Sequence, residues 1–145
     1  MVTIQQSYAV EKNDFTRAGE VSSRIKKIMK QVGVKPEIIR RVSVAAYEAE
    51  MNVIIHSYGG TIEFIITAEQ IKLIVLDRGP GIENTELAMK EGYSTATRDV
   101  RELGFGAGMG LPNMKRCADT FSIESEYGKF TKLVIVFNQT LDGME

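Results

Sequence analysis

The sequence predicts an α+β fold, a two-layer sandwich in which helices cover one face of a mixed, mostly antiparallel sheet. Strand-like segments come in adjacent pairs, helical segments also come in pairs, and the overall order is β-α-α-β-β-α-α-β-β. This order differs from the alternating β-α-β units that build a parallel sheet. With 145 residues and 43% hydrophobic content, residues 1–145 are expected to form one domain around a single core.

The strand predictions rest on apolar alternation and on β-branched content. Strands are expected at residues 2–8, 61–68, 70–77, 121–127 and 129–138. The second and third of these are separated by very few residues, which predicts a hairpin. The last two form another hairpin, with Gly128 at its turn.

Two helices are expected in the first half of the chain. The first is expected to begin at an N-cap on Asp14 and to run to about Lys30, with Gly33 closing it. Pro36 suits the first turn of the second helix, which is expected to continue until the glycines at 59–60.

The second half is expected to hold two shorter helices, at 83–92 and 111–119. Between them, residues 93–103 are polar and show no clear period, so we expect a mobile connection there.

Charge and composition exclude several classes of function. The chain has 18 basic and 19 acidic side chains, so it lacks the basic excess typical of proteins that bind nucleic acid or anionic membranes. The start has no signal-peptide pattern, and no apolar run approaches the length of a membrane span. A cytoplasmic protein is therefore expected. The single Cys117 fits a reducing compartment, and we expect it to pack under a helix.

The run GFGAGMG places glycines at positions 104, 106, 108 and 110. It does not follow a strand inside a β-α-β unit, so a dinucleotide-binding fingerprint does not fit, and no Walker-type P-loop sequence is present. Closely spaced glycines ahead of a helix let backbone N–H groups approach an anion such as phosphate. A flexible lid without a ligand is the alternative interpretation of this run.

The segment VLDRGPGI places Asp77 at the end of an apolar strand, followed by Gly79 and Gly81 in a tight turn. A partly buried carboxylate needs hydrogen-bond donors, and the exocyclic amine of adenine is one such donor. A turn made by two glycines would let a flat ligand lie against the backbone. The alternative is an ordinary turn in which the aspartate bonds its own backbone.

On the second helix, Glu48, Asn52 and His56 are spaced four residues apart and fall on one stripe. An asparagine oxygen can bind Mg²⁺, and a glutamate one turn away can deprotonate an attacking hydroxyl. A solvated polar face, with His56 as a simple helix cap, is the alternative. The neighbouring apolar residues are expected to face the core: Val44, Tyr47, Met51, Ile54 and Ile55.

Taken in order, these motifs resemble the Bergerat-fold ATPases. The resemblance rests on E-x-x-x-N-x-x-x-H on a helix, D-x-G-x-G after a strand, a glycine-rich segment before a helix and a threonine on a C-terminal strand. It covers about residues 8–138. Within this superfamily, the small size, the NVIIHSY helix end and the short lid look most like the bacterial anti-sigma-factor and switch-protein serine/threonine kinases.

The resemblance implies a role for each residue. Glu48 would be the general base, Asn52 would hold Mg²⁺, and Asp77 would bind the adenine amine of ATP. Further contacts to the nucleotide would come from Gly79, Gly81, Gly104, Gly106, Gly108, Gly110 and Thr131. The chain departs from the family in having Phe130 where a glycine often precedes that threonine.

The resemblance also implies partners. Histidine kinases usually carry asparagine where this chain has Glu48, so activation of a serine or threonine hydroxyl, or of water, is expected here. In the family this acceptor is typically a serine on a STAS-domain antagonist protein, and many members also bind a sigma factor. A homodimer is a further candidate assembly. An ATP-gated binding module without phosphotransfer, and an ATPase that drives a larger assembly, remain as alternatives.

Overall fold

The computed structural model of the chain describes residues 3–79, 81, 89 and 110–140. The expected helix at 83–92 and the expected mobile connection at 93–103 lie outside the described residues, except for residue 89. So do Gly104, Gly106 and Gly108, three of the four glycines of the expected phosphate loop. The outcomes below concern the described part of the chain.

Five strands form one sheet in the spatial order β1-β2-β3-β5-β4. Their bounds are β1 Ile4–Val10, β2 Gly60–Ile66, β3 Gln70–Arg78, β4 Thr120–Glu126 and β5 Phe130–Asn138. Every pairing between these five described strands is antiparallel. Both predicted hairpins are confirmed, and Gly128 adopts a positive φ of 86° in the turn between β4 and β5.

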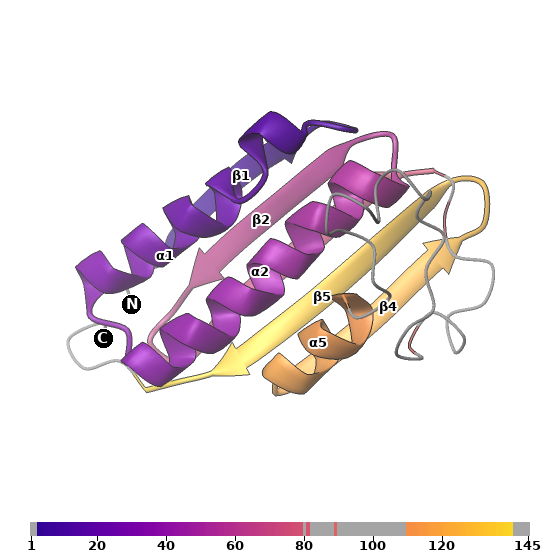
Figure 1. Cartoon of the computed structure of the whole chain (residues 1–145). Helices are drawn as coiled ribbons and strands as arrows, with labels where there is room; N and C mark the ends of the chain where they lie inside the picture. Colours follow the sequence, from indigo (N-terminus) through magenta and orange to yellow (C-terminus); the bar gives the residue numbers. More distant parts are fainter. Residues whose placement is uncertain (1–2, 80, 82–88, 90–109, 141–145) are drawn as a thin grey trace.

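The α-helices within the described ranges are α1 Glu20–Val32, α2 Pro36–His56 and α5 Gly110–Cys117. All lie on the same face of the sheet, with α2 between α1 and α5 (Figure 1). Pro36 occupies the first turn of α2, as predicted. Gly33 ends α1 in the left-handed conformation, with φ of 83°. The predicted two-layer α+β arrangement is therefore confirmed.

The predicted start of the first helix is wrong. Asp14 precedes only a short 3-10 turn at Phe15–Arg17, and its side chain makes no capping hydrogen bond. The chain then passes through Gly19, whose φ is 91°, and α1 begins at Glu20. The first N–H groups of α1 are bonded instead by Glu50 of α2, a residue far away in the sequence, so no local motif marks this helix start.

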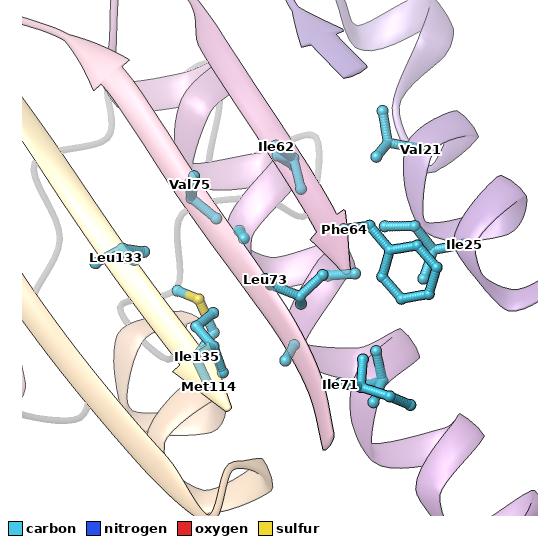
Figure 2. Close-up of a cluster of buried hydrophobic side chains, with 14 of the residues drawn as sticks. Val21, Ile25, Ile62, Phe64, Ile71, Leu73, Val75, Met114, Leu133 and Ile135 are labelled. Atoms are coloured by element: carbon cyan, nitrogen blue, oxygen red, sulfur yellow. The ribbon is translucent and has the colours of Figure 1, made fainter. Parts of the chain in front are cut away.

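The core fills the space between the sheet and the helices. Alternate residues of β2, β3 and β5 point into it and meet side chains of α1, α2 and α5 (Figure 2). Strand residues in this layer include Ile62, Phe64, Leu73, Val75, Leu133 and Ile135. Burying one large aliphatic or aromatic side chain stabilises a fold by about 1.5–3 kcal/mol.

The apolar stripe predicted on α2 is only partly in the core. Met51 and Ile54 are buried, but Val44 and Tyr47 are 40% and 39% exposed. The prediction for Val44 and Tyr47 is wrong because α1 and α5 flank α2 and leave its outward side uncovered (Figure 1). Small residues line much of the buried side of α2, among them Ala45, Ala46 and Ala49, which lets the helix lie close to the sheet.

The end of α2 lies beside the end of β3. The helix stops at His56, slightly earlier than predicted, because Ser57 turns the chain and bonds Val53 and Gly59. The Tyr58 N–H then donates to the Arg78 carbonyl, and the Arg78 N–H donates to the Gly59 carbonyl, both at 3.0 Å. The polar end of α2 and the last residues of β3 are therefore held at the same end of the sheet.

Candidate functional site

Asp77 lies on β3 and is paired on both sides, with Gly60 of β2 and with Thr131 of β5. There is no room for a side chain at position 60, because a Cβ there would lie 2.4 Å from the Leu76 carbonyl oxygen and 2.8 Å from the Asp77 Cα. Burial raises the pKa of Asp77 to about 6, against an opposing hydrogen bond from the backbone of Thr131. The carboxyl group is thus a half-buried acceptor fixed by the sheet.

Thr131 lies next to this acceptor and is 7% exposed. Its hydroxyl lies 3.0 Å from the hydroxyl of Ser125 on β4, and Ser125 also donates to the Phe130 carbonyl at 2.9 Å. Ser125 was not predicted as a site residue from the sequence. The predicted final hairpin pairs Ser125 with Thr131, and this pairing is the feature of the sequence that could have identified Ser125. Although Phe130 stands where the family often has glycine, Thr131 is still paired with Asp77.

The turn after Asp77 is held from two sides. The Gly79 N–H donates to the Lys129 carbonyl in the β4–β5 turn, and a Cβ on Gly79 would fall 2.6 Å from the ring of Tyr58. At Gly81, with φ of 75°, a Cβ would fall 2.4 Å from the Glu126 carbonyl oxygen. Glycine is favoured at position 79 by its positive φ of 37°, and at position 81 both by its positive φ and by the backbone of Glu126.

On α2, Glu48 and Asn52 are both partly exposed and lie beside the first residue of α5. A Cβ on Gly110 would lie 3.3 Å from the Glu48 Oε2 and 3.3 Å from the Asn52 Oδ1. The two oxygens therefore converge on the same point at the start of α5. The structure brings Glu48, Asn52 and Gly110 together, as the sequence predicted for the first two.

These oxygens fit a hard divalent cation such as Mg²⁺, which takes oxygen ligands and usually keeps waters and substrate phosphates in its coordination shell. Within the described ranges, no three His, Cys, Asp or Glu side chains gather closely enough to hold a metal by themselves.

His56 is the last residue of α2 and is partly buried. Burial lowers the pKa of His56, so the neutral imidazole is favoured. Cys117, at the end of α5, packs partly buried against the core, as expected, and burial raises the pKa of its thiol.

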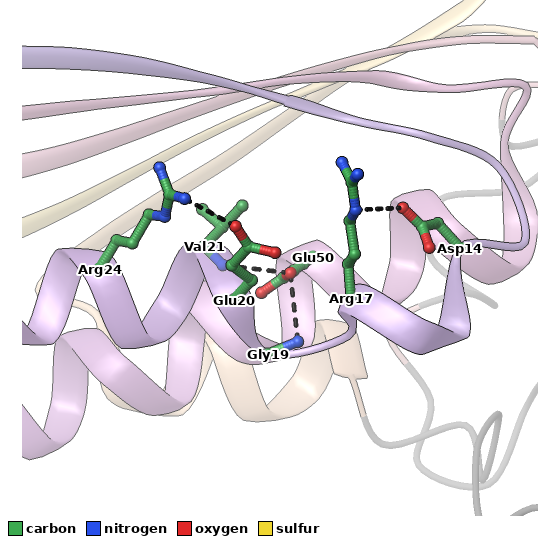
Figure 3. A network of polar contacts seen from close by, with 7 residues as sticks. All are labelled: Asp14, Arg17, Gly19, Glu20, Val21, Arg24 and Glu50. Atoms are coloured by element: carbon green, nitrogen blue, oxygen red, sulfur yellow. Dashed lines mark hydrogen bonds and ion pairs between the residues drawn. The ribbon is translucent and has the colours of Figure 1, made fainter.

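The opposite side of α2 carries a glutamate that the sequence did not single out. Glu50 is 2% exposed, and its Oε2 accepts the N–H groups of Gly19 and Val21 at 3.2 and 3.3 Å (Figure 3). Its Oε1 accepts the N–H of Ser22 at 3.2 Å. Burial raises the pKa of Glu50, and these backbone hydrogen bonds oppose that rise. This carboxylate replaces the missing local cap of α1.

Comparison with protein families places the chain among ATP-binding domains. The profile of the histidine kinase-like ATPase domain matches residues 12–137, which include the candidate residues of α2, β3, α5 and β5. No helix within the described part of the chain has the length and apolar character to cross a membrane.

Two curated relatives are similar over about two thirds or more of each chain. An anti-sigma F factor of Clostridium acetobutylicum is 39% identical over 104 residues, covering 68% of this chain and 69% of the relative. The serine/threonine-protein kinase RsbT of Bacillus subtilis is 30% identical over 110 residues, covering 73% and 77%.

Among solved structures, the SiaB–SiaC complex of Pseudomonas aeruginosa contains a chain of the same fold. The TM-score is 0.56 at 12% identity, and the match covers 91% of this chain and 88% of the other. At this identity the likeness concerns the fold alone.

Proposed function

Because the chain belongs to the family of histidine kinase-like ATPase domains, we propose that it is an ATP-dependent serine/threonine protein kinase of the switch type. The convergence of Glu48 Oε2 and Asn52 Oδ1 on the start of α5 is the observation that carries this proposal. A carboxylate beside a cation ligand is the arrangement that activates a hydroxyl for phosphoryl transfer.

In this proposal, Asp77 receives the adenine amine, with the Thr131 hydroxyl beside it. The backbone at Gly79 and Gly81 forms one wall of the base site. Gly110 begins the helix at the phosphate end, and Gly104, Gly106 and Gly108, outside the described residues, would complete the phosphate loop. Support comes from the half-buried, strand-fixed carboxyl group of Asp77.

Asn52 would hold Mg²⁺, which when bound neutralises charge on the phosphates. Glu48 takes the proton of the acceptor hydroxyl as the hydroxyl oxygen bonds to the γ-phosphorus. The bond from the γ-phosphorus to the bridging oxygen breaks, and ADP leaves with that electron pair. General-base assistance of this kind contributes about 10²- to 10⁴-fold to a rate.

The proposed acceptor is a serine or threonine on a STAS-domain antagonist protein. The names of the two curated relatives, a serine/threonine-protein kinase and an anti-sigma factor, support a role in partner switching. A sigma factor is a second proposed partner, and a homodimer a proposed assembly.

A second candidate is a nucleotide-gated binding module that holds a partner without transferring phosphate. It is favoured by the matches named anti-sigma F factor, which include proteins 36% to 39% identical to this chain. In that case no phosphate would be transferred, and Glu48 would not act as a general base.

The experiment is transfer of label from γ-labelled ATP with Mg²⁺ to STAS-domain proteins of the same cell. The native chain is compared with Glu48→Ala and with Glu37→Ala, a matched change at an exposed position of the same helix. Transfer that is lost only in Glu48→Ala supports the kinase. Tight ATP binding without transfer by the native chain would favour the binding module.

A further inference from the structure

A side chain of α5 contacts the proposed base from the neighbouring helix. The Asn113 Nδ2 group donates to the Glu48 Oε1 at 3.5 Å. On its other side, the Asn113 Oδ1 accepts from the Arg116 Nη2. Asn113 therefore links a guanidinium to the carboxylate of Glu48.

The chemistry of its two neighbours fixes the orientation of the Asn113 amide. A guanidinium has donors and no acceptor, and a carboxylate has acceptors and no donor. The amide oxygen must then face Arg116 and the amide nitrogen must face Glu48. A donor such as Arg116 also polarises the amide, which strengthens its N–H as a donor to Glu48.

Asn113 is carried by a helix that is fixed at both ends. Leu111, Pro112 and Met114, its neighbours in the sequence, are buried. At the far end of the helix, the Arg41 Nε donates to the Cys117 carbonyl at 2.8 Å. The amide of Asn113 is thus presented to Glu48 by a rigid element, which favours a lasting contact.

The two oxygens of Glu48 have different surroundings as a result. Oε1 accepts from Asn113, whereas Oε2 lies on the side of Gly110 and the Asn52 Oδ1. A hydrogen bond to Oε1 limits rotation of the carboxylate about its terminal bond and favours Oε2 on the side of Gly110 and Asn52.

We propose that Asn113 is a positioning residue for the kinase, which holds Glu48 through Oε1 so that Oε2 receives the proton of the acceptor hydroxyl. This inference rests on the proposed function. It assigns Asn113 no contact with substrate, so Asn113 acts on the transfer step and leaves ATP binding unchanged.

The first test compares the steady-state kinetics of Asn113→Ala, Asn113→Gln and Lys115→Ala. Lys115 is an exposed residue on the same helix and serves as the control. For Asn113→Ala, kcat should fall about 10- to 100-fold, the factor expected for losing a hydrogen bond to a charged group, with KM for ATP within about two-fold. Asn113→Gln keeps an amide donor and should recover part of this loss.

An equal loss in Asn113→Gln and Asn113→Ala, or a loss confined to KM, would overturn the inference while leaving the kinase in place. If the native chain transfers no label, the proposed function itself has failed. Thermal unfolding of each variant shows whether a loss of kcat merely reflects a loss of fold.

A second test does not depend on activity. The side-chain amide resonances of Asn113 in a ¹⁵N spectrum should move in Glu48→Ala and stay in place in Glu37→Ala. Unmoved Asn113 amide resonances in Glu48→Ala would contradict the contact, whatever the kinetics give.

Discussion

Each side of α2 carries a glutamate, and the two glutamates have different surroundings. Glu50 faces α1, is almost fully buried and accepts three backbone N–H groups. Glu48, two residues earlier and about 200° away around the helix, faces α5 and, within the described part of the chain, accepts a hydrogen bond from the Asn113 amide at 3.5 Å. The carboxylate of Glu50 is satisfied by the fold, whereas Glu48 has its Oε2 beside Gly110, on the same side as the proposed cation ligand Asn52.

The difference teaches how to separate a structural from a reactive carboxylate. A buried carboxylate whose oxygens are occupied by N–H groups stabilises the native state, since leaving those donors without a partner is costly. A partly exposed carboxylate that retains an accepting oxygen beside another oxygen ligand is available for chemistry. Substitutions on the two sides should therefore affect different measurements.

The largest effect is expected for Glu48→Gln. Replacing the proposed base by an amide should lower the rate of phosphoryl transfer by about 10²- to 10⁴-fold. Because the side chain is partly exposed, the free energy of unfolding should change by no more than about 0.5 kcal/mol. Rapid-quench transfer assays and urea unfolding of the same preparation measure both quantities. A large loss of stability in Glu48→Gln would contradict the idea that Glu48, unlike Glu50, contributes little to the stability of the fold.

The next effect concerns Asp77 and pH. In the proposed function, the ionised carboxylate of Asp77 is the form that accepts the adenine amine. Burial raises the pKa of Asp77 to about 6. ATP affinity should therefore be steady above pH 7 and fall toward tenfold per pH unit below pH 6. Calorimetric titration across this range measures the fall.

The control for this prediction is Asp77→Asn, which should bind ATP more weakly and lose the part of the pH dependence that belongs to Asp77. The same comparison removes the contribution of the phosphates of ATP, which also take up protons. Identical pH profiles for the native chain and Asp77→Asn would mean that another group is responsible.

A smaller effect, on stability alone, is expected for Glu50→Gln. An amide nitrogen would replace one of the two accepting oxygens and would face backbone N–H donors, so unfolding should become easier by about 1–3 kcal/mol. Transfer per folded molecule should stay the same. Urea unfolding monitored by circular dichroism measures the change, with Glu48→Gln as the control from the other side of α2.

The pH dependence of stability gives a further check on Glu50. Its pKa is raised above the ordinary value of 4.5, so the folded state binds this proton more tightly than the unfolded state. The contribution of Glu50 to stability should be most favourable below pH 4.5 and decline as pH rises through the raised value. The decline should be missing in Glu50→Gln.

The smallest effect is expected for Arg24→Ala. Arg24 pairs with Glu20 at 2.8 Å on the exposed surface beside the Glu50 network (Figure 3). Exposed pairs of this kind are worth about 0.3–0.5 kcal/mol. A measured loss above about 1 kcal/mol would mean that the surface ion pair, and not Glu50 alone, holds the start of α1.

Features that depend on neighbouring residues were predictable from the sequence. The Pro36 start of α2, the two hairpins and the position of Asp77 at a strand end follow from local patterns. The stripe of Glu48 and Asn52 follows from helical spacing. That Asp77 belongs to the same site as Glu48 and Asn52 was predicted only from the resemblance to a family.

Contacts between distant segments were not predictable. The cap of α1 comes from Glu50, about 30 residues away, so the local sequence suggested Asp14 instead. The roles of Gly60 and Asn113 likewise depend on which strand or helix lies beside them. Such contacts depend on which helices and strands pack against each other, and no short pattern in a single sequence specifies that packing.

The close approach of β2 to β3 at Gly60 limits how the proposed site for the adenine base could be redesigned. With backbone at Gly60 and Gly81 tightly packed against its neighbours, these positions leave no room for new side chains. Among the described residues of the proposed base site, Asp77 and the Thr131–Ser125 hydroxyl pair are the positions where selectivity could be changed. An amide at position 77 would offer a donor where guanine carries a carbonyl oxygen, so reprogramming toward another purine begins with that single exchange.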